Sequence, residues 1–158
     1  MGLFSKKKKE EVFCCPIKGR VASITETPDP AFAEKMMGDG IVIFPTDGVV
    51  YAPCDATVAF VFPTNHALGL KTDSEIELLI HVGIETVKLD GQGFKMLVNE
   101  GDSVKKGDKL LEFDLEYIKD NAESIATPFI VTNLNDKQTI KIQKTGDVSA
   151  SEDIFSIV

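Results

Sequence analysis

The sequence predicts an all-β protein, an antiparallel β-sandwich or barrel with short peripheral helices. From Val12 onward, short apolar runs are broken by Gly, Pro and Asp, a pattern typical of strands joined by tight turns. Residues 16–21 and 45–50 share a Pro-x-x-Gly-x-Val arrangement, in which a turn leads into a strand. Only two segments carry helix signals, and each is too short to form a layer of its own.

Length and composition favour a single folded domain. The chain has 158 residues, of which 43% are hydrophobic, so it can bury a sizeable core. Residues 1–11 include the lysine run 6–9 and are interpreted as a flexible basic tail. We therefore expect one domain over residues 12–158.

The N-terminal segment also bears on location. No apolar run approaches the ~18 residues that a membrane helix needs, and no apolar segment follows the lysines as it would in a signal peptide. We therefore expect a cytoplasmic protein. The tail is either solvated or makes a weak electrostatic contact with a membrane surface, with Leu3 and Phe4 as apolar anchors.

Charge and cysteine content narrow the function classes. A formal net charge of −8 argues against nucleic-acid binding, which needs a basic face, and suits the docking of basic partners. The three cysteines, an odd number without a secretory signal, indicate reduced thiols. Cys14 and Cys15 are interpreted as structural, with a catalytic thiol as the alternative, and no role is assigned to Cys54.

Helix-capping residues mark the two helical segments. Within residues 29–38, Asp29 suits the N-cap, Pro30 the first helical position and Gly38 the exit. Residues 114–121 form the second short candidate. Both helices should decorate the sheets.

Residues 75–86 hold one of the two histidines and alternate as a strand does. One face is wholly apolar and is expected to point into the core; it consists of Ile76, Leu78, Ile80 and Val82. Glu77, Leu79 and His81 share the other face, so we expect these three side chains to point outward.

The other histidine, His66, lies just upstream of a polar turn cluster at residues 71–75. If Asp73 and Ser74 form a two-residue hairpin loop, His66 and His81 are directly opposed, about 4.5–5.5 Å apart at Cα. Two facing histidines are consistent with ordinary surface residues, with a zinc site, or with one imidazole acting as a nucleophile. Composition leaves these three alternatives open.

Seven short motifs distinguish these alternatives, within a match that runs from about Cys15 to Ser149. They are FAEK at 32–35, GDG at 38–40, AP at 52–53, TNHA at 64–67, ELLIHVGIETV at 77–87, GQGF at 91–94 and EGDSVKKGD at 100–108. In order and spacing they resemble the glucose-type enzyme IIA of the bacterial phosphoenolpyruvate:sugar phosphotransferase system. The resemblance implies a phosphocarrier in which His81 carries the phosphoryl group and His66 supports its transfer.

Further residues gain expected roles around this pair. Thr64, two residues before His66 on the same face, is expected to orient His66 through its hydroxyl. By resemblance, Asp39 and Glu85 lie near the site, where their carboxylates attract a basic partner.

An apolar docking rim is expected around the histidines. Across the proposed hairpin, Leu68 opposes Leu79, and Phe62 lies on the same face as His66. Phe32 occupies the family position for the same rim. Core packing is the alternative for any one of them, but an apolar ring around two polar residues is typical of a docking face.

The resemblance also implies partners. The donor is HPr, the histidine-containing phosphocarrier protein, and the acceptor is a cysteine of the enzyme IIB domain of a sugar permease, so the chain supports sugar uptake. No cofactor is required. Some members of the family bind regulatory targets when unphosphorylated, with zinc bridged by the two histidines, here His66 and His81, and a partner carboxylate.

Two other function classes remain as alternatives. A zinc-dependent hydrolase on a similar β scaffold would use His66 and His81 but would need a third ligand and a base, from Cys54 or an acid. A biotin or lipoate carrier is suggested by residues 100–110, although no modifiable lysine at a hairpin tip is evident. A phosphohistidine rather than a biotinyl lysine would separate these classes.

Overall fold

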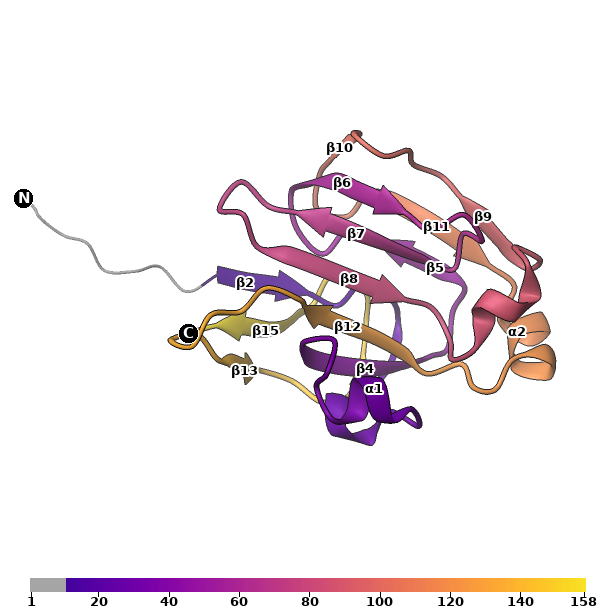
Figure 1. Cartoon of the computed structure of the whole chain (residues 1–158), viewed down its shortest axis with the longest axis horizontal. Coiled ribbons are helices and arrows are strands. Elements are labelled where there is room, and N and C mark those ends of the chain that lie inside the picture. The colour runs from indigo at the N-terminus through magenta and orange to yellow at the C-terminus, as the bar shows by residue number, and fades with distance from the viewer. Residues whose placement is uncertain (1–10) are drawn as a thin grey trace, which may run out of the picture.

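The chain is represented by a computed structural model that describes residues 11–158 (Figure 1). Every strand pairing in this range is antiparallel, which confirms the predicted all-β fold. Of the predicted tail, residues 1–11, only Glu11 is described, and it opens a strand; the rest lies outside the described residues. Within residues 11–158, no helix is long and apolar enough to cross a membrane.

The strands form three sheets. The largest has eight strands in the order β10 (Ser103–Val104), β6 (Ala56–Val61), β7 (Ala67–Lys71), β8 (Glu77–His81), β12 (Thr127–Val131), β4 (Asp39–Pro45), β3 (Gly19–Ser23) and β14 (Gly146–Val148). The others are β5 (Val49–Tyr51), β11 (Lys109–Phe113) and β9 (Phe94–Met96), and β13 (Ile140–Ile142), β15 (Asp153–Ile157) and β2 (Glu11–Cys14). Figure 1 shows β6, β7, β8 and β12 side by side across the molecule.

One face of the eight-stranded sheet, called the inner face, forms the main core. Leu78 and Ile80 of β8 point into it and are at most 1% exposed. Phe129 of β12 lies with its ring centroid 5.0 Å from that of Phe155 in β15, so two sheets meet across this core. Burial of each such side chain stabilises the fold by about 1.5–3 kcal/mol. The four residues predicted to point inward are all buried: Ile76, Leu78, Ile80 and Val82.

The opposite, outer face of the same sheet is also apolar near the histidines. It carries a second cluster of buried residues: Ala22, Ile24, Phe32, Val42, Ala67, Leu79, Ile84, Ala126 and Ile130. Leu79 is only 4% exposed, so the prediction that it faces solvent is wrong, although its assignment to the outer face is right. The helical segments η1 (Ile24–Glu26) and α1 (Pro30–Ala33) contribute Ile24 and Phe32 to this cluster and so help to cover Leu79.

Both predicted helices form and lie at the periphery (Figure 1). The side chain of Asp29 caps α1 by accepting from the Ala31 N–H at 2.9 Å. α1 ends earlier than predicted because Lys35, not Gly38, adopts the left-handed conformation that follows the last helical turn, with φ 61°. The second helix, α2 (Leu115–Asn121), falls within the predicted segment 114–121, and Asp114 is its N-cap. A short 3-10 helix, η2 (Thr86–Leu89), follows β8.

The loop of the β7–β8 hairpin is one residue longer than predicted. The Glu75 N–H donates to the Thr72 carbonyl at 2.9 Å, and Glu75 adopts a left-handed conformation with φ 69°. The Ile76 carbonyl then accepts from the Thr72 N–H at 3.0 Å, which closes a three-residue loop. Such loops combine a tight turn with one left-handed residue. Because the extra residue changes the register, the strand pairing next to the histidines shifts as well.

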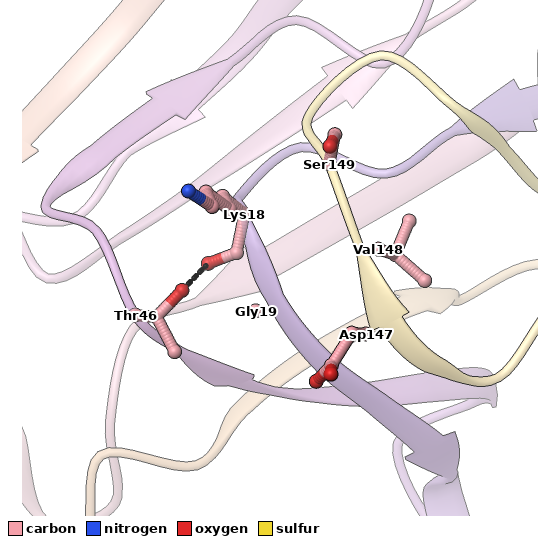
Figure 2. A pocket seen from close by; sticks show the side chains of 6 residues that line it. All are labelled: Lys18, Gly19, Thr46, Asp147, Val148 and Ser149. Carbon is pink, nitrogen blue, oxygen red and sulfur yellow. Dashed lines mark hydrogen bonds between the residues drawn. The ribbon is translucent and has the colours of Figure 1, made fainter.

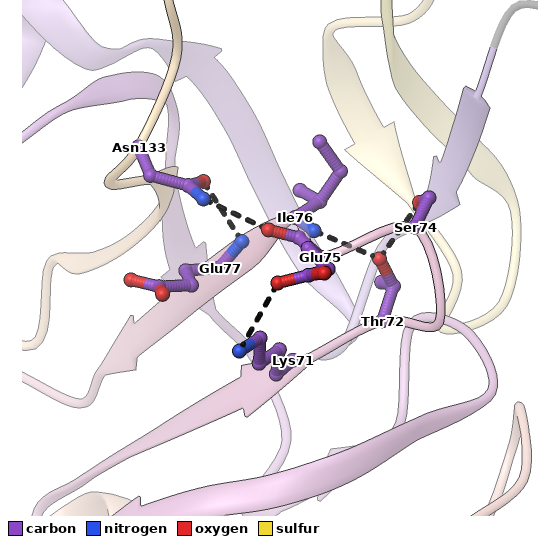
Figure 3. Close-up of polar contacts among 7 residues, drawn as sticks. All are labelled: Lys71, Thr72, Ser74, Glu75, Ile76, Glu77 and Asn133. Carbon is purple, nitrogen blue, oxygen red and sulfur yellow. Dashed lines mark hydrogen bonds and ion pairs between the residues drawn. The ribbon is translucent and has the colours of Figure 1, made fainter.

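Polar contacts hold this loop in place (Figure 3). The Thr72 hydroxyl accepts from the Ile76 N–H at 3.0 Å. Asn133, which follows β12, accepts from the Glu77 N–H at 2.9 Å and donates to the Glu75 carbonyl at 2.8 Å. The hairpin that ends in His81 is therefore tied to β12 at its far end.

Candidate functional site

His81 ends β8, and its ring orientation follows from one hydrogen bond. Its Nδ1 lies 2.9 Å from the carbonyl oxygen of Gly83. A carbonyl only accepts, so Nδ1 carries the proton, and in the neutral ring Nε2 keeps a free lone pair. Gly83 has φ 77°, a left-handed conformation that favours glycine and lets the chain turn back toward the ring.

His66 lies in the turn between β6 and β7 and is 2% exposed. Its carbonyl accepts from the Val82 N–H at 2.8 Å, which joins the turn to the end of β8. Its Nδ1 lies 2.6 Å from the hydroxyl of Thr64, so the predicted contact between these two side chains is present. Asn65, between them, takes a left-handed conformation with φ 59° that brings both side chains to the same place.

The two histidine rings are neighbours although their backbones are not directly opposed. His81 pairs with Ala67, so the predicted pairing of His66 with His81 is wrong by one residue. The three-residue loop causes this shift. The ring centroids nevertheless lie 4.8 Å apart at an interplanar angle of 80°. His66 lies outside β7, which begins at Ala67, so strand alternation does not fix the direction of its side chain.

Burial keeps both histidines neutral at pH 7. Desolvation, and then the neighbouring His81, lowers the pKa of His66 from its ordinary value of 6.5 to about 4. Desolvation also lowers the pKa of His81, although the hydrogen bond to Gly83 and the charge of Asp29 oppose this shift. A neutral imidazole is the form that attacks phosphorus or binds a metal.

The histidines line a depression of about 270 Å³, together with the side chains of Asp29, Phe32, Phe62, Glu85, Thr86 and Val87. Three predicted site residues are therefore in place. The ring of Phe32 lies 5.2 Å from that of His81, and the ring of Phe62 lies 5.2 Å from that of His66. Glu85 adds a carboxylate to the rim.

Three residues expected to contact a partner do not line the depression. Leu68 pairs with Ile80, points into the main core and is fully buried, so its placement on the rim is wrong; the register shift is the cause. Leu79 lies beneath the site in the outer cluster. Asp39 is at the start of β4, where its carboxylate lies 3.6 Å from Lys35 Nζ.

Some residues of the depression were not predicted. Asp29, Thr86 and Val87 line it, and the ring of Phe94 lies 6.5 Å from that of His66. Asp29 is recognisable in the sequence as a helix cap, but nothing local indicates that α1 packs against β8. Thr86 lies within the motif around His81, yet its burial depends on the turn at Gly83.

Three other depressions are lined by residues other than the two histidines. One, of about 350 Å³, is lined by Lys18, Gly19, Thr46, Asp147, Val148 and Ser149, and the Thr46 hydroxyl donates to the Lys18 carbonyl at 3.4 Å (Figure 2). The second, of about 330 Å³, is mostly apolar and includes Phe60, Phe62 and Leu79. The third, also of about 330 Å³, contains Cys54, but burial raises the pKa of that thiol to about 12. Of these depressions, the one lined by the histidines therefore offers the more reactive side chains.

The cysteines are protected thiols. Cys14 and Cys15 are buried, and Cys54 is partly buried. Burial raises the pKa of all three, to about 11 for Cys15 and about 12 for Cys54. Thiols with raised pKa values are poor nucleophiles, which favours the structural interpretation.

The sequence model of one protein family matches most of the chain. The sequence model for the phosphoenolpyruvate-dependent sugar phosphotransferase system, EIIA 1, matches residues 11–137. The chain belongs to this family. The prediction drawn from the seven motifs, an EIIA phosphocarrier acting in sugar uptake, is therefore confirmed at this level.

Individual relatives agree with this EIIA assignment. The PTS system glucose-specific EIIA component of Bacillus cereus is 50% identical over 135 residues, which are 85% of this chain and 82% of that protein. The corresponding component of Staphylococcus epidermidis is 47% identical over 153 residues, 95% of this chain and 92% of that protein. The glucose-specific EIICBA component of Staphylococcus carnosus is 50% identical over 146 residues, and the chain spans only 22% of that relative's length.

A solved structure confirms the sandwich architecture of this EIIA. Glucose permease IIA from Mycoplasma capricolum is 36% identical and matches with a TM-score of 0.89, over 94% of this chain and 96% of that chain.

Proposed function

We propose that Nε2 of His81 accepts a phosphoryl group from HPr and passes it to the enzyme IIB domain of a sugar permease. The observation that carries this proposal is the 2.9 Å hydrogen bond from His81 Nδ1 to the Gly83 carbonyl. Because this bond holds the ring proton on Nδ1, the lone pair of Nε2 is free to attack. The lowered pKa keeps that lone pair unprotonated at neutral pH.

Each transfer exchanges one bond to phosphorus for another. Nε2 of His81 attacks the phosphorus of phosphohistidine on HPr in line with the breaking N–P bond, and the donor imidazole leaves with its electron pair. His81 keeps its Nδ1 proton, so its ring gains positive charge, which the Gly83 carbonyl stabilises. In the second transfer a IIB thiolate attacks the same phosphorus, and His81 leaves as the neutral ring.

His66 stabilises the transferred group rather than carrying it. With the Thr64 hydroxyl donating to Nδ1 across 2.6 Å, the remaining ring proton of His66 lies on Nε2. From there it donates to a phosphoryl oxygen, whose charge grows in the transition state. A hydrogen bond to a charged group contributes about 1.5–3 kcal/mol.

The rim of the depression supplies the docking face. Phe32 and Phe62 exclude water around the histidines, which protects the N–P bond from hydrolysis. Asp29 and Glu85 place carboxylates at the same depression, and Asp39 adds one farther out. Together with the net charge of −8 of the whole chain, these carboxylates favour partners with a basic docking surface.

Zinc fits the pair only with help from a partner. His66 and His81 offer two Nε2 atoms, His66 only in the tautomer whose Nδ1–H donates to the Thr64 hydroxyl, whereas zinc usually takes four ligands. Over residues 11–158, no group of three His, Cys, Asp or Glu side chains is placed to hold a metal. Zinc bound between this EIIA and a regulatory target would therefore take its remaining ligands from that target. Nothing in the comparisons or the described residues favours the alternative of a zinc hydrolase.

We place residues 12–158 in a single enzyme IIA domain that acts in the cytoplasm. The core clusters support this domain, since the larger one draws on strands from β2 to β15. HPr and IIB must both reach the depression, so they dock on the same face of the protein, one after the other.

Reconstitution of the phosphoryl chain tests this function. The protein is incubated with phosphoenolpyruvate, enzyme I and HPr, and the phosphorylated peptide is mapped by mass spectrometry, with HPr omitted as the control. We expect one phosphoryl group on the peptide that contains His81, labile in acid and stable in base. A label on Ser, Thr or Cys would contradict the proposal.

A further inference from the structure

The carbonyl that orients His81 belongs to a peptide group whose C=O and N–H are both hydrogen-bonded. In the peptide between Gly83 and Ile84, the Gly83 oxygen accepts from His81 Nδ1 at 2.9 Å. The Ile84 N–H of the same peptide donates to the Ser124 carbonyl at 2.9 Å. The orientation of this peptide therefore determines whether His81 has an acceptor for an Nδ1 proton.

Two threonines hold the preceding peptide, between Val82 and Gly83. The Thr86 hydroxyl donates to the Val82 carbonyl at 2.7 Å. The Gly83 N–H is directed at the Thr127 hydroxyl across a longer 3.4 Å. All four polar groups of the two peptides that flank Gly83 thus have hydrogen-bond partners. Of the two contacts made by threonine hydroxyls, the one from Thr86 is the shorter.

Thr86 also fills the space that Gly83 leaves. A Cβ at Gly83 would lie 2.5 Å from Cγ2 of Thr86, so the threonine methyl occupies the place of a side chain there. Thr86 has no exposed surface, and a buried hydroxyl is costly unless it is bonded. Its hydroxyl is committed to Val82, so it acts on the site through the backbone rather than by touching the phosphoryl group.

We infer that Thr86 is a positioning residue that sets the tautomer of His81 by holding the backbone at Gly83. This inference rests on the proposed function, since it concerns the nitrogen that attacks phosphorus. Glycine rotates freely, so without the hydroxyl the Gly83 carbonyl is less firmly held under the ring. The His81 proton then spends part of its time on Nε2, where it blocks the nucleophile.

Three substitutions separate the effect of the Thr86 hydroxyl from that of its methyl group. Thr86→Val removes the hydroxyl at nearly constant shape, and Thr86→Ser keeps the hydroxyl without the methyl. Thr86→Ala leaves room at the depression for water and serves if the valine variant does not fold. Thr127→Val is the matched control, because Thr127 is equally buried but makes the longer contact.

Nitrogen NMR of the unphosphorylated protein reads the tautomer directly. We expect wild-type and Thr86→Ser His81 to hold the proton on Nδ1, and Thr86→Val or Thr86→Ala to show a mixture of tautomers. Phosphate uptake from HPr should fall about fivefold in the variants without the hydroxyl, the effect of one ordinary hydrogen bond. Thr127→Val should change both readouts less.

A folded Thr86→Val or Thr86→Ala protein with an unchanged Nδ1–H tautomer would overturn the inference. So would an equal shift in Thr86→Ser, because the methyl rather than the hydroxyl would then be responsible. Failure of the proposed function looks different: wild-type His81 would take up no phosphate, whatever its tautomer.

Discussion

The two faces of the eight-stranded sheet are both apolar near the histidines, but they do different things. On the inner face, Leu78 and Ile80 pack into the main core between the sheets. On the outer face, Leu79 and Ala67 belong to a smaller cluster that also includes Phe32, a residue lining the histidine depression. One strand therefore stabilises the fold with alternate residues and supports the site with the residues between them.

The largest effect is expected from a charge placed inside the outer cluster. Leu79→Asp places a carboxylate at a position that is 4% exposed, with no partner for its charge. Burial of an unpaired charge costs more than a domain of this size can lose, so we expect the protein not to fold. Circular dichroism checks this directly. A native thermal transition would show that the outer cluster is open to solvent.

The inner face should affect stability without affecting transfer. Ile41→Ala, in β4, removes a fully buried side chain of the main core. We expect the free energy of unfolding to fall by about 2–5 kcal/mol. Urea unfolding measures the loss, and phosphate uptake per folded molecule should stay at the wild-type rate. A reduced uptake rate would mean that the two faces are coupled.

The rim of the outer face should affect docking without affecting the fold. Phe62→Asp alters a half-buried residue beside His66, and interface anchors of this kind commonly contribute at least ~2 kcal/mol. Phosphate uptake at limiting HPr should therefore slow about thirtyfold, with an unchanged unfolding midpoint. Ile142→Asp, on β13 of another sheet, is the matched control for an exposed apolar residue. Equal effects of both variants would contradict the assignment of the rim.

The smallest effect is the pH dependence of stability. His66 has a pKa of about 4 when folded and an ordinary value of 6.5 when unfolded. Between these values the unfolded chain binds more protons, so the stability that is fully present above pH 6.5 declines as the pH falls toward 4. Urea unfolding at pH 7.5, 6.5 and 5.5 should show this decline, and His66→Gln should make it shallower. Identical declines would mean that folded His66 titrates normally.

Alternation along β8 was readable from the sequence because the strand period is fixed. All four residues predicted to point inward do so, and His81 and Leu79 share the outer face as predicted. The seven motifs identified the family, and the Thr64–His66 spacing predicted a contact that is present.

The sequence did not reveal the length of the β7–β8 loop or which segments cover Leu79 on the outer face. Glu75 takes a left-handed conformation that usually signals glycine, so nothing local indicated a three-residue loop. That one residue moved Leu68 from the expected rim into the core. Likewise, the burial of Leu79 depends on η1 and α1, which lie far away in the sequence.

The central claim is that the two adjacent histidines are not equivalent, His81 being the nucleophile and His66 its support. The most direct measurement is phosphoryl transfer by His81→Ala and His66→Gln, side by side with wild type, from HPr and onward to IIB. We expect His81→Ala to take up no phosphate. His66→Gln should be phosphorylated but should pass the group on about ten- to a hundred-and-fifty-fold more slowly, the loss of one hydrogen bond to a charged group. A labelled His81→Ala protein beside an unlabelled His66→Gln protein would reverse the assignment.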